Sequence, residues 1–168
     1  HPGLSVLDMT CPYVKRIHRI ADENTGEDTL FILIGAAHHP EVEGIMSHVR
    51  GEGKVFSGSD ELQAYLKIAK NTEKKVIAAA QTTQNLSEWK KTQEILAKVY
   101  TNAKFFDTIC SVTEKRQTEV ASLSRECDCM VIVGGKDSSN TAKLFEISSG
   151  NCHDTVWVET KDELNISN

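Results

Sequence analysis

Residues 30–35, which read Leu-Phe-Ile-Leu-Ile-Gly, decide the fold class. An unbroken run of large apolar side chains that ends in glycine is typical of a strand buried on both faces, as in a parallel sheet covered by helices. Residues 12–21 before this run favour a helix. A second helix is expected to begin at Pro40, because proline suits the first helical turn. This order of helix, buried strand and helix predicts an α/β fold.

The same alternation continues along the rest of the chain. Short apolar runs predict further strands, and stretches with helical periodicity separate them. Strands are expected at 4–7, 54–56, 75–80, 104–107, 130–133 and 155–158, and helices at 60–69, 87–100, 112–124 and 142–147. Because strands that alternate with helices form parallel sheets, we expect small, mostly parallel sheets between helical layers.

An internal repeat relates the two parts of the chain. Asp-Thr-Ile-Cys at 107–110 parallels Asp-Met-Thr-Cys at 8–11, and Cys110 lies 99 positions (110 − 11) after Cys11. The same offset relates three further pairs: Gly35 and Gly134, His39 and Ser138, and Glu41 and Asn140. We therefore predict two related three-layer lobes, 1–106 and 107–168. The second lobe is expected to be truncated, because its counterpart of the strand and loop at 75–83 would fall beyond Asn168.

The composition disfavours several classes of function. A formal net charge of −5 argues against nucleic acid or an anionic membrane surface as the partner. No apolar run approaches the roughly 20 residues that a membrane helix needs, and no secretion leader is visible. Five cysteines, an odd number, suit a reducing cytoplasm better than a disulfide framework. We therefore expect a cytoplasmic protein, and the lack of any Cys-x-x-Cys pair argues against structural zinc.

Cys11 and Cys110 are each expected where a strand meets a helix, at the edge of the sheet where α/β folds bind ligands. The N-terminus of a helix stabilises negative charge and lowers the pKa of a thiol placed there. A thiolate is the ligand that iron requires, so both cysteines are candidate metal ligands. The alternative is that each is a small buried apolar residue. We interpret Cys127, Cys129 and Cys152 as structural.

His39 and Glu41 lie at the start of the helix expected from Pro40. A histidine beside the free N–H groups of a helix start suits a phosphate or a metal. Glu41, in the first turn, could transfer protons in a partly dry site. The alternative is that His39 caps the helix and Glu41 only complements its dipole.

Two further polar loops follow expected strands. Residues 134–140, Gly-Gly-Lys-Asp-Ser-Ser-Asn, offer hydroxyls, an amide and a helix N-terminus to a diphosphate, although their spacing does not match a nucleotide-binding Walker loop. Residues 81–85, Gln-Thr-Thr-Gln-Asn, could hydrogen-bond a polar ligand. Helix capping would explain the first loop equally well, and a plain turn the second.

Taken in order, these segments resemble the LytB/IspH family of 4-hydroxy-3-methylbut-2-enyl diphosphate reductases. The cysteine segment at 8–12 looks like that family's Asp-Ala-Thr-Cys-Pro, and His-Pro-Glu-Val-Glu-Gly at 39–44 matches its motif without a change. Residues 81–83 are similar to its Thr-Gln-Thr-Thr loop, and 138–140 match its Ser-Ser-Asn. The segment at 107–110, followed by Thr113, Arg116 and Gln117, resembles a further cysteine segment of the family. The resemblance runs from about Leu4 to Trp157.

The resemblance implies a fold and a set of roles. Family members have three related α/β lobes around a central cavity, a pseudo-three-fold arrangement in which each lobe gives one cysteine to a 4Fe-4S cluster. Residues 1–106 would then be the central lobe and 107–168 part of the third. Cys11 and Cys110 would be metal ligands, and Glu41 and Thr82 catalytic. The substrate-binding residues would be His39, Gln81, Thr82, Ser138, Ser139 and Asn140.

The implied activity is reductive removal of the allylic hydroxyl of the substrate, which gives isopentenyl and dimethylallyl diphosphate in the non-mevalonate pathway. Ferredoxin or flavodoxin would be the usual electron donor. The family's first cysteine has no counterpart here, and Asp137 stands where asparagine is usual. We therefore expect that this chain alone neither holds an intact cluster nor turns over substrate.

Two other classes of function stay open at this point. A non-catalytic anion-binding or scaffold module would bind the diphosphate without iron. A different α/β enzyme would use Cys11 or Cys110 as a nucleophile with His39, and thiol alkylation would then abolish an iron-independent activity.

Overall fold

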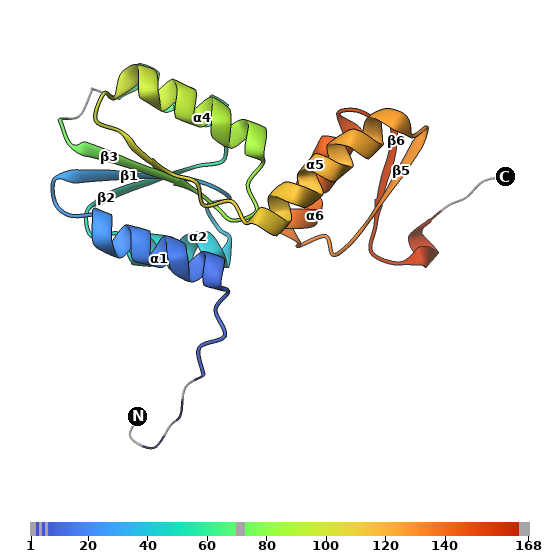
Figure 1. The fold of residues 1–168 in the computed structure, drawn as a ribbon, viewed down its shortest axis with the longest axis horizontal. Coiled ribbons are helices and arrows are strands. Elements are labelled where there is room, and N and C mark those ends of the chain that lie inside the picture. Colours follow the sequence, from blue (N-terminus) through green and yellow to red (C-terminus); the bar gives the residue numbers. More distant parts are fainter. Residues whose placement is uncertain (1–2, 4, 6, 70–72, 165–168) are drawn as a thin grey trace.

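The computed structural model describes residues 3, 5, 7–69 and 73–164, which form two parallel sheets with their helices (Figure 1). In chain order the elements are α1 (Pro12–Asn24), β1 (Thr29–Ile34), α2 (Pro40–Ser47), β2 (Glu52–Phe56), α3 (Ser59–Ile68), β3 (Lys75–Ala80), α4 (Leu86–Val99), β4 (Lys104–Phe106), α5 (Ser111–Glu126), β5 (Cys129–Val133), α6 (Ser139–Ser149), β6 (Asp154–Val158) and the short 3-10 helix η1 (Lys161–Glu163). The α/β class with small parallel sheets is confirmed.

The first sheet has four strands in the order β2-β1-β3-β4, and every neighbouring pair is parallel. All six residues of β1 are buried, as the apolar run predicts. Leu30, Ile32 and Ile34 face α3 and α4, whereas Phe31 and Leu33 face α1 and α2. Both faces of the sheet are thus covered, which completes a three-layer unit. Because the strands are parallel, their carboxyl ends lie at one edge of the sheet.

The second sheet consists of β5 and β6, also parallel. Helix α6 covers one face, where the ring of Phe145 lies 5.6 Å from that of Trp157. On the opposite face Val131, Val133 and Val156 are exposed by 43%, 67% and 44%. In the described residues this unit therefore has helices on one face only, and the third layer that the repeat predicts is not among them.

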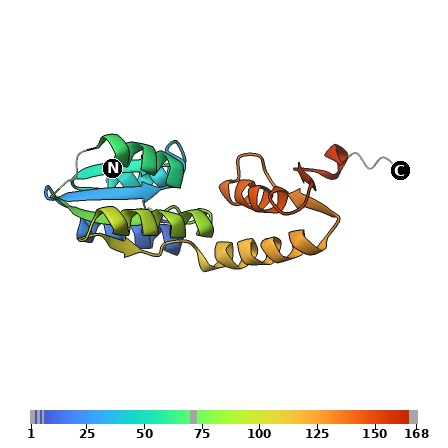
Figure 2. The same ribbon diagram turned by 90° about the horizontal axis from the view of Figure 1, so that it is seen from above.

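In each unit, an equivalent hydrogen bond joins the glycine after the first strand to the last residue of the neighbouring strand. The N–H of Gly35 donates to the C=O of Phe56 at 2.9 Å, and the N–H of Gly134 donates to Val158 at 3.0 Å. The predicted division at 106/107 falls between the two sheets. Figure 2 shows the units side by side, connected by the chain that runs from β4 into α5. Two sheets do not by themselves define two domains, so the division stays a prediction.

The strand expected at 4–7 lies partly outside the described residues, and the described Ser5 and Leu7 are not in a strand. Leu4 and Val6 lie outside the described residues, and the stretch from Leu7 to Cys11 is irregular. Leu7 and Met9 are more than four-fifths exposed, so no sheet partner or core covers them. Hydrogen bonds from Lys15 and Thr10 instead hold the pKa of Asp8 well below its usual range. Cys11 therefore precedes α1 without ending a described strand.

His18 packs between α1 and α2. Its ring stacks on that of His48 with 4.3 Å between centroids, and its Nε2 points at Gly44, where a Cβ would lie 3.5 Å away. Nε2 is buried and has no hydrogen-bond partner in the described part of the chain. Burial, with the neighbouring His48, lowers the pKa of His18 from 6.5, although nearby carboxylates oppose this.

This lowered pKa predicts acid sensitivity. The unfolded chain protonates His18 near pH 6.5, whereas the folded chain does so only at lower pH, so the free energy of unfolding should fall as the pH drops below about 6.5. His18→Phe keeps the stacked ring but removes the titration, so its stability should fall less. Urea unfolding at about pH 7.5 and about pH 5.5 measures the difference. His153→Gln, at an exposed histidine, should behave like the unaltered chain. Equal losses in His18→Phe and the unaltered chain would refute the assignment.

Candidate functional site

The loop at residues 81–85, which follows β3, joins the other predicted site segments. The N–H of Cys110 donates to the C=O of Thr82 at 2.9 Å. The hydroxyls of Thr83 and Ser139 are 2.8 Å apart, which connects the loop to the start of α6. The predicted segments at 39–41, 107–110 and 138–140 therefore meet around one loop at the carboxyl edge of the first sheet.

Glu41 and Thr82 form a doubly bonded pair. Oε1 of Glu41 accepts the N–H of Thr82 at 2.7 Å, and Oε2 accepts its hydroxyl at 2.8 Å. Thr82 is 6% exposed. Both carboxylate oxygens are thus fixed, and the hydroxyl, which donates to Glu41, can still accept a hydrogen bond. A hydrogen-bonded carboxylate–hydroxyl pair can hold a proton and pass it to a bound group.

His39 is the N-cap of α2, and its Nδ1 accepts the N–H of Glu41 at 3.1 Å. A backbone N–H can only donate, so Nδ1 carries no proton and the proton of the neutral ring is on Nε2. The capping role and the ligand-binding role of His39 are therefore compatible, because the cap leaves Nε2–H as a donor with no partner among the described residues.

Gln81 is 2% exposed, and only one of the two polar atoms of its side chain has a hydrogen-bond partner among the described residues. Its Oε1 accepts the N–H of Ala36 at 3.0 Å, whereas Nε2 is buried without a partner in the described residues. A buried donor without an acceptor is uncommon in folded proteins and suits an oxygen of a ligand. Gly35 makes the arrangement possible, because a Cβ there would lie 2.9 Å from both Cβ and Oε1 of Gln81.

The start of α6 supplies the remaining candidates. Ser138 caps the helix by accepting the N–H of Thr141 at 3.2 Å, and its own proton is left to donate. Asn140 Oδ1 is buried without a partner among the described residues. Turning that amide over would present its two N–H groups instead. Asp137, whose charge could oppose a diphosphate, is exposed and can stay hydrated.

Each candidate cysteine is the N-cap of a helix, Cys11 of α1 and Cys110 of α5. Cys11 is exposed and Cys110 half-buried. The hydroxyls of Tyr13 and Ser111 are 2.7 Å apart, so the first turns of the two helices lie together. The described residues contain no group of three or more metal-ligating side chains that could hold an ion. Iron–sulfur clusters take their ligands mainly from cysteine, and the cluster-ligand role expected for these two helix-capping thiols stays a prediction.

Comparison with known proteins decides the family. The family model described as LytB protein matches residues 1–168, the whole chain. This chain belongs to the LytB family. The resemblance inferred from the sequence motifs is therefore confirmed.

Similar curated proteins are named 4-hydroxy-3-methylbut-2-enyl diphosphate reductase. The one from Helicobacter pylori (strain Shi470) is 34% identical over 165 residues, which cover 98% of this chain and 58% of that protein. The one from Aquifex aeolicus (strain VF5) is 38% identical over 165 residues, covering 96% and 55%. The chain thus spans less than two thirds of the length of these relatives.

Two solved structures are similar to this LytB chain. A structure of (E)-4-hydroxy-3-methyl-but-2-enyl diphosphate reductase matches with 36% identity and a TM-score of 0.55, over 98% of this chain and 58% of that one. The Plasmodium falciparum reductase matches with 24% identity and a TM-score of 0.78, over 93% and 49%. The second likeness concerns the fold alone.

No helix in the described residues is long and apolar enough to cross a membrane.

The LytB chain also holds Cys110 in place through residues that were not singled out as candidates. Asp107 Oδ1 accepts the indole N–H of Trp89 at 2.8 Å and the amide of Gln93 at 3.0 Å. The hydroxyl of Thr108 bonds both the N–H and the C=O of Ala80, at 2.9 and 2.6 Å. The signal was present in the Asp-Thr before the cysteine, but its partners lie on other elements.

The remaining cysteines differ from one another. Cys152 is buried, and its thiol lies 3.4 Å from the C=O of Cys127. Cys127 and Cys129 are exposed. A structural role fits the burial of Cys152, and the structural interpretation of Cys127 and Cys129 stays a prediction.

Gly35→Ala should disrupt the Gln81 contact. The added methyl would overlap the Gln81 side chain, and its Cβ would lie 3.0 Å from Val42 Cγ2. We expect a loss of about 1–3 kcal/mol in the free energy of unfolding, as for an overpacked core. Urea denaturation measures this loss. Gly26→Ala, where the nearest atom would be 3.6 Å away, is the matched control. If the two variants are equally stable, the close approach is not required.

Proposed function

We propose that this LytB chain forms part of a 4-hydroxy-3-methylbut-2-enyl diphosphate reductase, to which it gives two cluster ligands and most of the substrate pocket. One observation carries the proposal: the bond from Cys110 N–H to Thr82 C=O, which joins the backbone of a ligand cysteine to that of the residue paired with Glu41. Both relatives compared above bear this enzyme's name.

In this proposal the diphosphate is held by uncharged donors. His39 Nε2–H and Gln81 Nε2–H come from the first unit, and Ser138, Ser139 and Asn140 from the second. A helix N-terminus also favours an anion through its free N–H groups, and α2 and α6 both begin here. Such a grip would hold the substrate hydroxyl in one place and so reduce the entropic cost of the reaction.

Thr82 and Glu41 would supply the proton that leaves with the hydroxyl. Loss of that group as water consumes two electrons and two protons overall. The Thr82 hydroxyl donates to Glu41 across this 2.8 Å contact, and protonation of Glu41 would reverse the bond. Thr82 would then donate its own proton to the departing oxygen and take up the proton of Glu41, while the second proton goes to the allylic carbon. Cys11 and Cys110 would hold the iron–sulfur cluster together with further ligands. When bound, that cluster would supply electrons and an iron atom with an open position.

Ferredoxin or flavodoxin would be the electron donor, and thiolate ligands require a reducing compartment such as the cytoplasm. The thiol-nucleophile alternative has less support. His39 Nδ1 is occupied by Glu41 N–H, and no hydrogen bond joins His39 to either candidate thiol in the described residues.

A chimera tests the proposal, with this chain in place of the matched segment of the H. pylori relative. Cys110→Ser should lower the iron content and reduce kcat/KM by roughly a hundredfold or more. Replacing a residue that only orients a metal ligand already lowers metal affinity or activity by up to about a hundredfold. Anaerobic turnover of the diphosphate substrate with a chemical reductant measures this. Cys127→Ser, at an exposed cysteine beyond α5, should change neither quantity. A folded chimera that binds substrate without turnover, or equal effects of both variants, would contradict the proposal.

The chain alone should bind no stable cluster, because its described residues provide too few ligands. Anaerobic reconstitution with iron and sulfide, followed by gel filtration and iron analysis, should leave substoichiometric iron. Titration with inorganic diphosphate asks separately whether the anion pocket is formed. Diphosphate binding without iron would favour the anion-binding module for the chain by itself. A stable cluster on the chain would show that our expectation of an inactive fragment is wrong.

A further inference from the structure

In the part of the chain that the structure describes, four hydrogen-bonded links join α5 and α6 to the first unit, residues 7–106. Three are described above: Cys110 to Thr82, Ser111 to Tyr13, and Ser139 to Thr83. The fourth comes from Gln117, which lies two turns into α5 and is 4% exposed. Its Nε2 donates to the C=O of Gln84 at 2.9 Å, and its Oε1 accepts the N–H of Leu86 at 3.0 Å.

Gln117 therefore clamps the loop that carries Thr82. Its carboxamide bonds a C=O and an N–H of the main chain on either side of Asn85, much as a neighbouring strand would. Asn85 Oδ1 is itself occupied, because it caps α4 by accepting the N–H of Ser87 at 2.9 Å. The loop is thus fixed by Glu41 near its start and by Gln117 at its end. Both partners of the clamp are backbone groups, so it depends on Gln117 alone.

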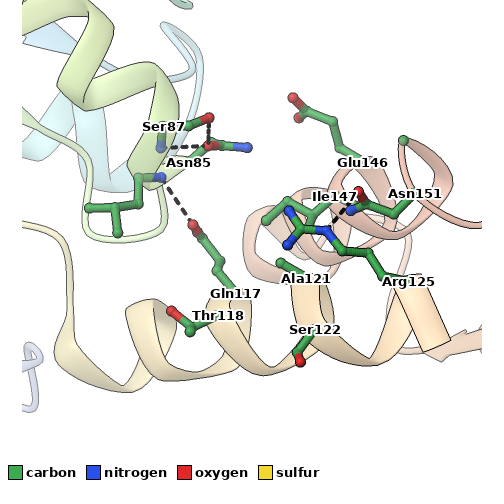
Figure 3. Close-up of a pocket in the computed structure, with 12 residues that line it drawn as sticks. Asn85, Ser87, Gln117, Thr118, Ala121, Ser122, Arg125, Glu146, Ile147 and Asn151 are labelled. Atoms are coloured by element: carbon green, nitrogen blue, oxygen red, sulfur yellow. Dashed lines mark hydrogen bonds between the residues drawn. The ribbon is translucent and has the colours of Figure 1, made fainter.

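A cleft opens beside the clamp. It has a volume of about 590 Å³ and lies between the start of α4, the outer turns of α5 and the end of α6. Figure 3 shows Gln117 reaching from α5 to the start of α4, whereas Ala121 and Arg125 further along α5 face the open cleft. Within the described residues the two units are thus held together at one end of α5 and separate along the rest. In an interface of this shape, the few hydrogen bonds at its closed end determine the angle between the two units.

We propose that Gln117 is a positioning residue that sets the angle of α5 and α6 against the first unit, and with it the placement of Cys110 and Ser139 around Thr82. The inference rests on the proposed function for its catalytic meaning. The clamp itself can be tested without cluster or substrate. Gln117 makes no contact with the reacting groups in this proposal.

The test compares Gln117→Ala, Gln117→Glu and the control Thr118→Ala in the full chain. Thr118 also lines the cleft, but its hydroxyl bonds only the C=O of Glu114 on its own helix. Iodoacetamide labelling, followed peptide by peptide, gives the rate at Cys110 relative to exposed Cys129. Gln117→Ala should raise this ratio and speed hydrogen exchange in residues 82–86, each roughly tenfold. The reason is that losing a buried hydrogen bond changes the equilibrium between closed and open forms by about a factor of ten. Thr118→Ala should change neither.

Gln117→Glu provides a readout that a purely structural role would not produce. Its carboxylate can still accept from Leu86 but repels the C=O of Gln84, so the clamp should be open at neutral pH. Protonation at acid pH restores a donor, and hydrogen exchange in 82–86, corrected for its intrinsic pH dependence, should approach that of the unaltered chain. If Gln117→Ala fails to fold, this pH-dependent recovery decides the question.

Unchanged exchange and labelling in a folded Gln117→Ala, no acid recovery in Gln117→Glu, or equal loosening of β1 and β5 would overturn the proposal. In the chimera, Gln117→Ala should lower kcat between about ten- and a hundredfold, the scale of a small misplacement, with iron content unchanged. A clamp that responds as expected in a chimera without turnover would leave the positioning role standing while the proposed function fails. Turnover in the chimera without a response of the clamp would support the proposed function and overturn the positioning role of Gln117.

Discussion

The candidate site depends on the main chain of Thr82. Its N–H is held by the Glu41 carboxylate, its C=O accepts the N–H of Cys110, and its hydroxyl bonds the same carboxylate. These bonds tie the loop after β3 to the helix after β1 and to the cysteine after β4. Removing any of them would leave a buried polar group unpaired, which costs more than the bond itself contributes. The geometry of the site is therefore cooperative.

The parallel sheet makes this convergence possible. Register β1–β3 places Ile34 opposite Ala80, so Gly35 and Gln81 leave the sheet side by side. Gly35 lets the Gln81 carboxamide approach the backbone of the loop after β1. The hydroxyl of Thr108 then continues the bonding of β3 beyond the last residue of β4. A sheet whose strands run one way brings three loops to one edge, and small residues between them decide how close the loops come.

Much of this arrangement could be predicted from the sequence, because the apolar run at 30–34 and the strand–helix alternation carry strong periodicity. The Glu41–Thr82 pair could not, since its partners are 41 residues apart and meet only through the register of β1 and β3. The strand expected at 4–7 lies partly outside the described residues, and Leu7, which has the apolar character of a strand residue, is exposed without a partner strand among them. Local sequence specifies elements, whereas pairing between them requires the assembled sheet.

The repeat uses similar backbone geometry for two kinds of helix N-cap residue. His39 and Ser138 occupy equivalent N-cap positions, and each accepts the backbone N–H that it caps. The imidazole leaves one directional donor, whereas the hydroxyl leaves a donor that can rotate. A diphosphate offers acceptor oxygens in several directions, so a rigid donor from one unit and adjustable donors from the other can satisfy it together. In the proposed function, that division of labour requires a fixed angle between the units, and the buried Gln117 clamp would hold that angle.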